Sequence, residues 1–285
     1  MFLIIGYIII LAASLGTFSV HGSLAALWVP LEYLAIFGLA VGSFIAGNDL
    51  KAIKATIAAL PTVFKGSKFN RTLYVDLLAM LFEVLSKVRK EGLMSIEGDV
   101  ENPEGSPIFS KYPTLASDHH VMEFITDYLR MMVGGNLNAM EIENLMDIEI
   151  ETHHHEVEIP AHIVTKIADA TPAFGIVVAV MGVVNVMGSV GEPPPVLGKM
   201  IGGALVGTFF GILLAYGFVA PVATILENKA HEGSKIYQVI KVVLLASMSG
   251  YAPQVAVEFG RKVLFSSDRP TFAELEAELK ARRGK

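Results

Sequence analysis

Four stretches of the chain contain no Asp, Glu, Lys or Arg, and they constrain the fold more than any other feature. They cover residues 1–31, 33–48, 170–191 and 200–226. The hydrocarbon core of a bilayer is about 30 Å thick, so a helix of roughly 20 apolar residues crosses it. Three stretches reach that length outright, and the second reaches it if Leu31 and Glu32 lie at the headgroups. The sequence therefore predicts an all-α membrane protein with four transmembrane helices.

The order of the four stretches groups them into two helical hairpins. We expect the first hairpin over residues 1–50, with spans at about 1–20 and 31–48. The second covers residues 170–226, with spans at about 170–191 and 200–221 around a Gly/Pro-rich turn. Residues 1–20 lack the basic segment and the cleavage site of a signal peptide, which favours a true span. Residues 242–257 are uncharged but short and more polar, which indicates a buried or interfacial helix.

Basic residues orient these hairpins. Of the 22 Lys and Arg residues, only Lys199 lies in a turn between two spans. Lys and Arg near span ends favour the cytoplasmic side of a membrane. We therefore expect the loop of residues 51–169, the segment of residues 227–285 and both termini to be cytoplasmic.

The cytoplasmic segments have the patterns of helices. Apolar side chains recur at helical spacing over residues 73–88, where Glu83 and Lys87 form a predicted i,i+4 pair. A second helix over residues 121–133 is expected to stop at Gly134-Gly135, and residues 101–107 have the composition of a loop. Two further helices are predicted to begin with capping boxes. Asn138 with Glu141 begins an acidic helix that ends near His153, and Thr271 with Glu274 begins the last helix. Residues 51–169 should thus form a large helical domain, and residues 227–285 further helices.

Several kinds of chemistry are excluded or disfavoured. The chain has no cysteine, no phosphate-binding G-x-x-x-x-G-K-[ST] loop and no distinguishable Ser/His/Asp set, so neither an enzyme nor a cofactor is predicted. A net charge of −6 argues against nucleic-acid binding. Three consecutive histidines, residues 153–155, point about 100° apart on a helix and cannot share one metal ion, and the pair at residues 119–120 meets the same objection. We interpret these as surface histidines and predict no metal site.

Seven acidic residues without an intervening base follow Gly135 (Glu141, Glu143, Asp147, Glu149, Glu151, Glu156 and Glu158). Two interpretations stay open: they attract cations or a basic partner, or they form a solvated helix face near the inner mouth of a pore.

The central parts of the spans contain no acid, base or histidine, although a proton relay normally needs an ionisable group inside the membrane. The polar residues that remain include Ser43, Asn185, Thr208 and Tyr216. Pro172 and Pro221 mark the inner ends of the third and fourth spans, either as a helix start or as a pair of kinks. Such a chain can form the wall of an ion path in the lipid bilayer, and a partner chain must supply the ion carrier.

Several co-linear motifs resemble the MotA family of flagellar stator subunits. They are Pro172-Ala173-Phe174-Gly175, residues 206–217 (VGTFFGILLAYG), Gly250-Tyr251-Ala252-Pro253 with residues 256–262 (AVEFGRK), residues 98–103 (GDVENP) and residues 43–48 (SFIAGN). The resemblance covers essentially the whole chain.

This resemblance implies a protein of the bacterial inner membrane. Five copies would surround two copies of MotB, whose membrane helix carries the ion-binding aspartate, and proton flow would drive the rotor switch protein FliG. The family's rotor-contacting positions fall on Arg89 and Glu97. Its mechanistic prolines fall on Pro172 and Pro221 and its pore threonine on Thr208, whereas sodium-driven relatives carry a second threonine where this chain has Ala179.

The related ExbB/TolQ energy transducers supply the alternative. Their similarity to this chain covers two spans, but they have three spans in all and differently arranged loops. In that case the chain would energise an outer-membrane partner instead of a rotor. A purely structural membrane scaffold is the third possibility.

Overall fold

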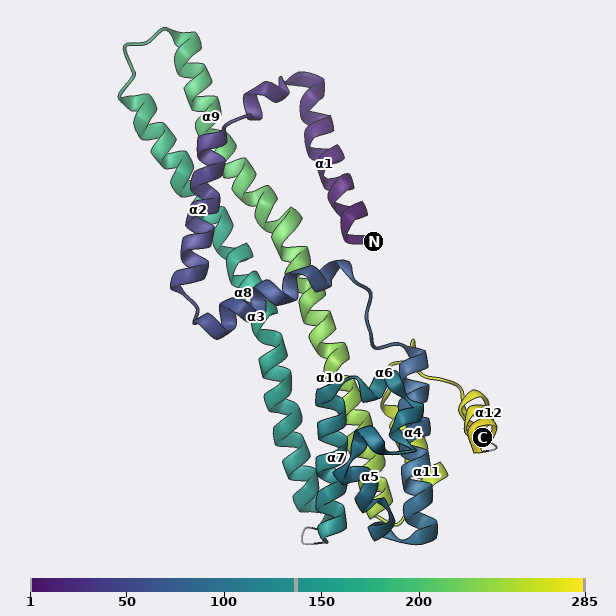
Figure 1. Cartoon of the computed structure of the whole chain (residues 1–285). Coiled ribbons are helices and arrows are strands. Elements are labelled where there is room, and N and C mark those ends of the chain that lie inside the picture. The colour runs from purple at the N-terminus through teal and green to yellow at the C-terminus, as the bar shows by residue number, and fades with distance from the viewer. Residues whose placement is uncertain (1, 136–137, 284–285) are drawn as a thin grey trace. The chain divides into compact units, whose positions relative to one another are not determined.

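The structure is a computed structural model that describes residues 2–135 and 138–283, and it is helical throughout (Figure 1). No strand occurs in those two ranges, so the predicted all-α class is confirmed. The chain divides into two compact units, each made from two segments. We call Met1–Gly66 with Val157–Asn228 the span unit, and Ser67–Glu156 with Lys229–Lys285 the bundle unit.

The span unit holds the apolar helices. They begin with α1 (Phe2–His21), η1 (Leu24–Leu27), α2 (Pro30–Ala46), α3 (Leu50–Ala59) and η2 (Leu60–Phe64). The later part of α8 (Ala139–Met187) then pairs antiparallel with α9 (Pro194–Ile212), which leads into η6 (Leu213–Val219) and α10 (Ala220–Met248) (Figure 1). By length and composition, four helical stretches are able to cross a membrane.

Helix α8 differs from its predicted limits. The helix expected to begin near residue 170 begins at Ala139, and the acidic helix expected to end near His153 is part of it. At about 1.5 Å per residue its 49 residues extend about 74 Å, more than twice the thickness of a bilayer core. Pro172 lies inside this helix, so the interpretation of Pro172 as a helix start is wrong.

The fourth span has a π-helical segment that the sequence did not reveal. Segment η6 follows α9 directly and ends just before Pro221, near the start of α10. A proline ring crowds the carbonyl four residues earlier and donates no hydrogen bond to it, and here that carbonyl belongs to Gly217. Widening the helix ahead of Pro221 relieves this conflict, and π segments recur at functional sites.

The bundle unit packs helices around one apolar core. Its elements are α4 (Arg71–Glu91), η3 (Leu93–Ile96), α5 (Glu97–Glu101), η4 (Pro103–Gly105), η5 (Phe109–Lys111), α6 (Pro113–Ala116), α7 (His119–Gly134), α11 (Pro253–Val263), α12 (Phe272–Arg283) and the ends of α8 and α10. The fully buried core includes Leu77 and Leu81 from α4, Ile125 from α7 and Ile240 from α10. Burial of these side chains in one core brings together segments that are far apart in the sequence.

The predicted helix signals are confirmed in the bundle unit. The Asn138 amide donates to Glu141 Oε2 at 2.8 Å, and the Glu141 amide donates to Asn138 Oδ1 at 3.0 Å. The Thr271 amide and hydroxyl both donate to Glu274, which lowers the pKa of that carboxyl. Helix α7 ends at Gly134, and Gly135 caps it with φ of 65°.

Residues 242–257 do not form a fifth span. Helix α10 ends at Met248, Gly250 adopts a φ of 84°, and α11 begins at Pro253. Val243 and Leu244 are fully buried in the bundle core. The buried-helix interpretation is therefore confirmed.

Candidate functional site

Helices α8 and α9 approach each other through small residues. A Cβ atom built on Gly175 would lie 2.8 Å from the Gly207 carbonyl oxygen and 3.1 Å from the Gly211 Cα. A Cβ built on Gly182 would lie 2.6 Å from the Cβ of Ala204. Small residues let membrane helices pack backbone to backbone. This contact fixes which parts of the two spans face each other.

Two of the predicted ion-path positions lie along this contact. The Cα of Thr208 is 3.4 Å from a Cβ built on Gly175, one turn of α8 before Ala179. The amide nitrogen of Ala179 is 3.5 Å from a Cβ built on Gly207, the residue before Thr208. Both side chains are half-buried. The structure therefore brings Thr208 and Ala179 to the same stretch of neighbouring helices.

The other three positions extend from this stretch. Pro172 is half-buried one turn before Ile176 in α8, and Pro221 is half-buried at the start of α10. Tyr216 lies in η6 with 60% of its surface exposed. The predicted wall thus consists of an alanine, a threonine and a tyrosine that lie between two prolines in the sequence.

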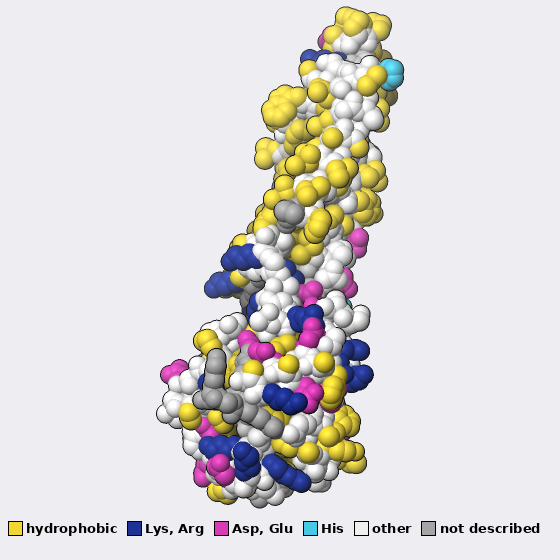
Figure 2. Space-filling model, turned by 90° about the vertical axis from the view of Figure 1, so that its right-hand side faces the viewer, with side chains coloured by type: hydrophobic (Ala, Val, Ile, Leu, Met, Phe, Trp, Pro, Cys, Tyr) yellow, Lys and Arg dark blue, Asp and Glu magenta, His cyan; other side chains and the backbone are white. Residues whose placement is uncertain are grey.

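The spans leave most of their apolar surface uncovered. No side chain of α1 is buried, and only Ile36 of α2 is. Large exposed side chains on α8 and α9 include Val180, Val184, Leu205 and Phe209. On the face shown in Figure 2, hydrophobic side chains cover the spans, whereas charged side chains gather on the bundle unit. Such a surface requires lipid or further chains around it.

Tyr7 is a residue that sequence reasoning missed. Its hydroxyl donates to the Phe218 carbonyl at 2.7 Å, and its ring lies 4.8 Å from that of Phe218. Phe218 belongs to η6, where the regular hydrogen-bond ladder is interrupted. Tyr7 thereby ties α1 to the π segment. Only its position in the first uncharged stretch distinguishes it in the sequence.

Arg89 and Glu97, the predicted rotor-facing pair, lie on either side of a sharp turn. Arg89 is in the last turn of α4, and Glu97 is the first residue of α5. Gly92 ends α4 with φ of 87°. Residues other than glycine rarely adopt this backbone conformation. Both charged side chains are exposed. A partner surface can reach both.

A buried ionic contact holds this turn in place. Asp99 accepts hydrogen bonds from Lys87 at 2.7 Å and from the Ser106 hydroxyl at 2.6 Å, and its side chain is 4% exposed. The predicted Glu83–Lys87 pair is therefore wrong, since Lys87 bonds to Asp99. Glu83 instead accepts from Lys111 and from the Tyr112 hydroxyl. These contacts join residues 7 to 29 positions apart, which helical spacing cannot predict.

The three consecutive histidines do point in different directions, but His153 and His154 are half-buried. His153 contacts the Tyr237 ring, with 4.6 Å between centroids, and burial lowers the pKa of its imidazole. His154 Nδ1 lies 2.7 Å from the Ser234 hydroxyl. Only His155 is exposed, beside Glu151. The different directions of the three side chains were therefore predicted correctly, whereas the partial burial of His153 and His154 was not.

The acidic residues of α8 are partly neutralised within the bundle unit. Lys241 lies 2.6 Å from Asp147 and 3.4 Å from Glu143. Glu149 accepts a hydrogen bond from Tyr128 at 2.7 Å. Burial, together with this hydrogen bond, raises the pKa of the Tyr128 phenol. Part of the run is thus a set of internal contacts, an interpretation that the sequence did not suggest.

Two family models match the chain. Residues 4–92 match the model for the motility protein A N-terminal region, and residues 116–239 match that of the MotA/TolQ/ExbB proton channel family. The chain belongs to the MotA family. It is 50% identical to motility protein A of Escherichia coli (strain K12) over 99% of this chain and 96% of the relative. It is also 32% identical to the chemotaxis protein LafT of Vibrio parahaemolyticus, over 92% of each chain.

Solved structures have the same fold as this MotA-family chain. A chain of the flagellar MotAB stator complex from Bacillus subtilis superposes with a TM-score of 0.73 at 26% identity, over 96% of this chain and 98% of that one. A chain of C. jejuni MotAB gives a TM-score of 0.76 at 22% identity, over 94% and 98%. The chain is thus a multi-pass membrane protein of a family that is not an enzyme class.

Proposed function

We propose that this MotA-family chain is the larger stator subunit of a flagellar motor. With a single-span partner, MotB, it forms a complex that conducts protons and converts the ion-motive force into torque on the rotor. The observation that carries the proposal is the α8–α9 hairpin. It presents exposed apolar surface and a few polar positions along an uncharged membrane segment, so it forms a wall that lacks an ion carrier.

The stator function is favoured over that of an ExbB/TolQ-type energy transducer. The proton channel family model includes both kinds of protein, so residues 116–239 do not discriminate between them. The N-terminal region does, because residues 4–92 match a model specific to motility protein A and contain two further candidate spans. A transducer has only three spans. The first hairpin is therefore the discriminating part of the chain.

A partner-dependent proton flux is the expected result of reconstitution. The chain should co-purify with the one-span protein, at five copies to two, and vesicles containing both should take up protons. Vesicles with this chain alone should not, because the centres of its spans contain no ionisable group. Subunit imaging and a pH-sensitive dye measure the two outcomes. Rapid flux through the chain alone would contradict the proposal.

The topology that we propose places both termini, residues 51–169 and residues 227–285 in the cytoplasm. The reason is that all Lys and Arg residues except Lys199 lie in these segments. Since the chain has no cysteine, single cysteines report sidedness cleanly. Ser23→Cys and Gly191→Cys should react with an impermeant maleimide added to cells, whereas Ser106→Cys and Ser266→Cys should not. The opposite pattern would reverse the orientation.

We propose that Arg89 and Glu97 face the rotor switch protein FliG. Both are exposed, and Asp99 and Lys87 hold the turn that carries them. Arg89→Glu and Glu97→Lys together should reduce swimming speed while membrane level and partner binding stay normal. A single exposed ion pair contributes below about 1 kcal/mol, so single neutral substitutions should have small effects.

The matched control for this charge reversal is Glu276→Lys, which breaks an exposed i,i+4 pair with Lys280 in α12. It should leave swimming unchanged. Restoration of speed by an opposite charge reversal on FliG would identify the contact, and normal swimming of the Arg89/Glu97 double variant would remove it.

A further inference from the structure

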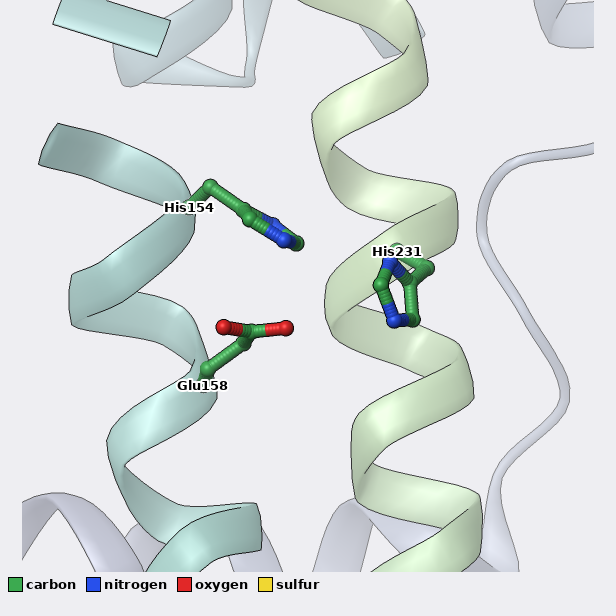
Figure 3. Close-up of side chains that lie close together, drawn as sticks. All are labelled: His154, Glu158 and His231. Atoms are coloured by element: carbon green, nitrogen blue, oxygen red, sulfur yellow. The ribbon is translucent and has the colours of Figure 1, made fainter. Parts of the chain in front are cut away.

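Two histidines that are far apart in the sequence lie together in the bundle unit. His154 is on α8 and His231 is on α10, and their ring centroids are 5.1 Å apart. A ring nitrogen of one lies within 4.8 Å of a ring nitrogen of the other. Figure 3 shows the His154 side chain extending from α8 toward α10, where His231 lies. The objection that neighbouring histidines on one helix diverge does not apply, because these rings come from two helices.

A hydroxyl group next to His154 orients its ring. The Ser234 hydroxyl lies 2.7 Å from His154 Nδ1 and 3.1 Å from the Ala230 carbonyl oxygen. When the hydroxyl donates to that carbonyl, it accepts from Nδ1, and the Nε2 atom then carries the lone pair. Metal-binding histidines are commonly oriented in this way, by a hydrogen bond donated from the second ring nitrogen.

A carboxylate follows on the same face of α8. Glu158 lies four residues after His154 on an uninterrupted helix, so the two side chains are neighbours, as Figure 3 shows. The Glu158 side chain is 14% exposed, and its carboxylate lies 3.7 Å from Nε2 of the exposed His162, one further turn along. Two imidazoles and a carboxylate are the ligand set of many zinc sites, with water as a fourth ligand.

Water and ions can reach the two histidines. A cavity of about 520 Å³ opens beside them, with Ser234, Asp147 and Glu151 among its lining residues. His231 is exposed, so its ring can rotate toward His154. The His154 ring, which contacts Ser234, then provides the oriented ligand, and His231 the adjustable one.

We propose that His154 and His231, together with Glu158, bind a divalent transition-metal ion of the zinc class. Imidazole and carboxylate ligands suit Zn²⁺, Ni²⁺ and Cu²⁺, whereas Mg²⁺ and Ca²⁺ prefer oxygen ligands alone. The chain contains no thiol that competes for such an ion. A bound ion would link α8 to α10 through their facing turns.

Zinc titration of the full-length chain with its partner, purified with a histidine-free tag, tests this site. Wild type should bind one Zn²⁺ per chain in calorimetry, and the ion should raise its unfolding temperature, because a ligand of the folded state stabilises it. His154→Ala and His231→Ala should each abolish both effects. Ser234→Ala should weaken the affinity by about 10- to 100-fold, as loss of an outer-shell partner does. Glu158→Gln should weaken it while some binding remains.

His155→Ala is the matched control, because His155 precedes Glu156 on an exposed face and should not matter. His162→Ala tests whether the neighbouring ring substitutes as a ligand, and it should bind Zn²⁺ as wild type does. His231 is exposed, so its replacement should leave the fold intact without metal, which the unfolding temperature in chelator verifies. Absence of saturable binding in wild type, or unchanged binding in both His154→Ala and His231→Ala, would overturn the site.

Discussion

Replacing Gly175 with isoleucine should abolish motility and lower the amount of chain in the membrane. A Cβ at this position would lie 2.8 Å from the Gly207 carbonyl oxygen and 3.1 Å from the Gly211 Cα. Both atoms belong to the backbone of α9, so no side-chain rotation relieves the overlap. Overpacking a core usually costs about 1–3 kcal/mol, and more where the backbone must move. Here α8 must separate from α9 along the contact that holds Thr208 and Ala179.

The matched control is Gly202→Ile, which makes the same chemical change on α9. A Cβ at Gly202 would meet no atom within 4 Å, and Gly202 is exposed. Immunoblotting of membranes and swimming in soft agar measure the two variants. Full motility of Gly175→Ile at a normal membrane level would show that the α8–α9 contact is not needed, and equal damage by both variants would indicate a general effect of bulk.

The parts of the fold that local chemistry determines were predictable from the sequence. Charge-free stretches identify the spans because lipid excludes charge. The capping boxes at Asn138 and Thr271 were found because each needs only residues three positions apart. The left-handed cap at Gly135 follows the same rule.

The continuity of α8 was not predictable in this way. The prediction ended the acidic helix near His153 and began a span near residue 170, where the charge-free stretch starts. A change of surroundings from water to lipid does not interrupt the backbone hydrogen bonds of a helix, so α8 runs through both. Pro172 donates no backbone hydrogen bond, yet α8 continues through it. The π segment before Pro221 was likewise hidden, since a proline pattern alone does not show whether a helix ends, kinks or widens.

In the candidate site, too, some features were predictable from the sequence and others were not. The positions on the α8–α9 hairpin were named from a resemblance, and the glycine contacts explain why two of them meet. The Lys87–Asp99 contact, the Tyr7 hydrogen bond and the His154–His231 pair all join different helices. Helical periodicity contains no information about such pairs, so only the packed chain reveals them.

Swimming driven by this chain and its own partner should persist without sodium and stop when a protonophore is added. Sodium must lose water and be held by several oxygen ligands, as hard cations generally are. A proton needs only a carboxylate and a chain of water or hydroxyl groups. Thr208 offers one hydroxyl per chain, and Ala179 offers no side-chain oxygen. We therefore predict that the coupling ion is the proton.

Ala179→Thr tests the same argument about oxygen ligands by adding a hydroxyl to the proposed ion path. Ala179 is half-buried, and its backbone lies near Gly207, next to Thr208. An added hydroxyl at this position should change the rate of proton uptake, since it gives the path a second oxygen beside Thr208. Ala179→Val adds similar volume without the oxygen and separates the two effects. Proton uptake should differ between the Thr and Val variants at equal membrane levels. Equal uptake in wild type and both variants would mean that Ala179 does not face the ion path. A strict sodium requirement of the unmodified chain, with swimming that resists a protonophore at alkaline pH, would overturn the prediction that the coupling ion is the proton. Backbone carbonyls near Pro172 and Pro221 would then be the candidates for the missing ligands.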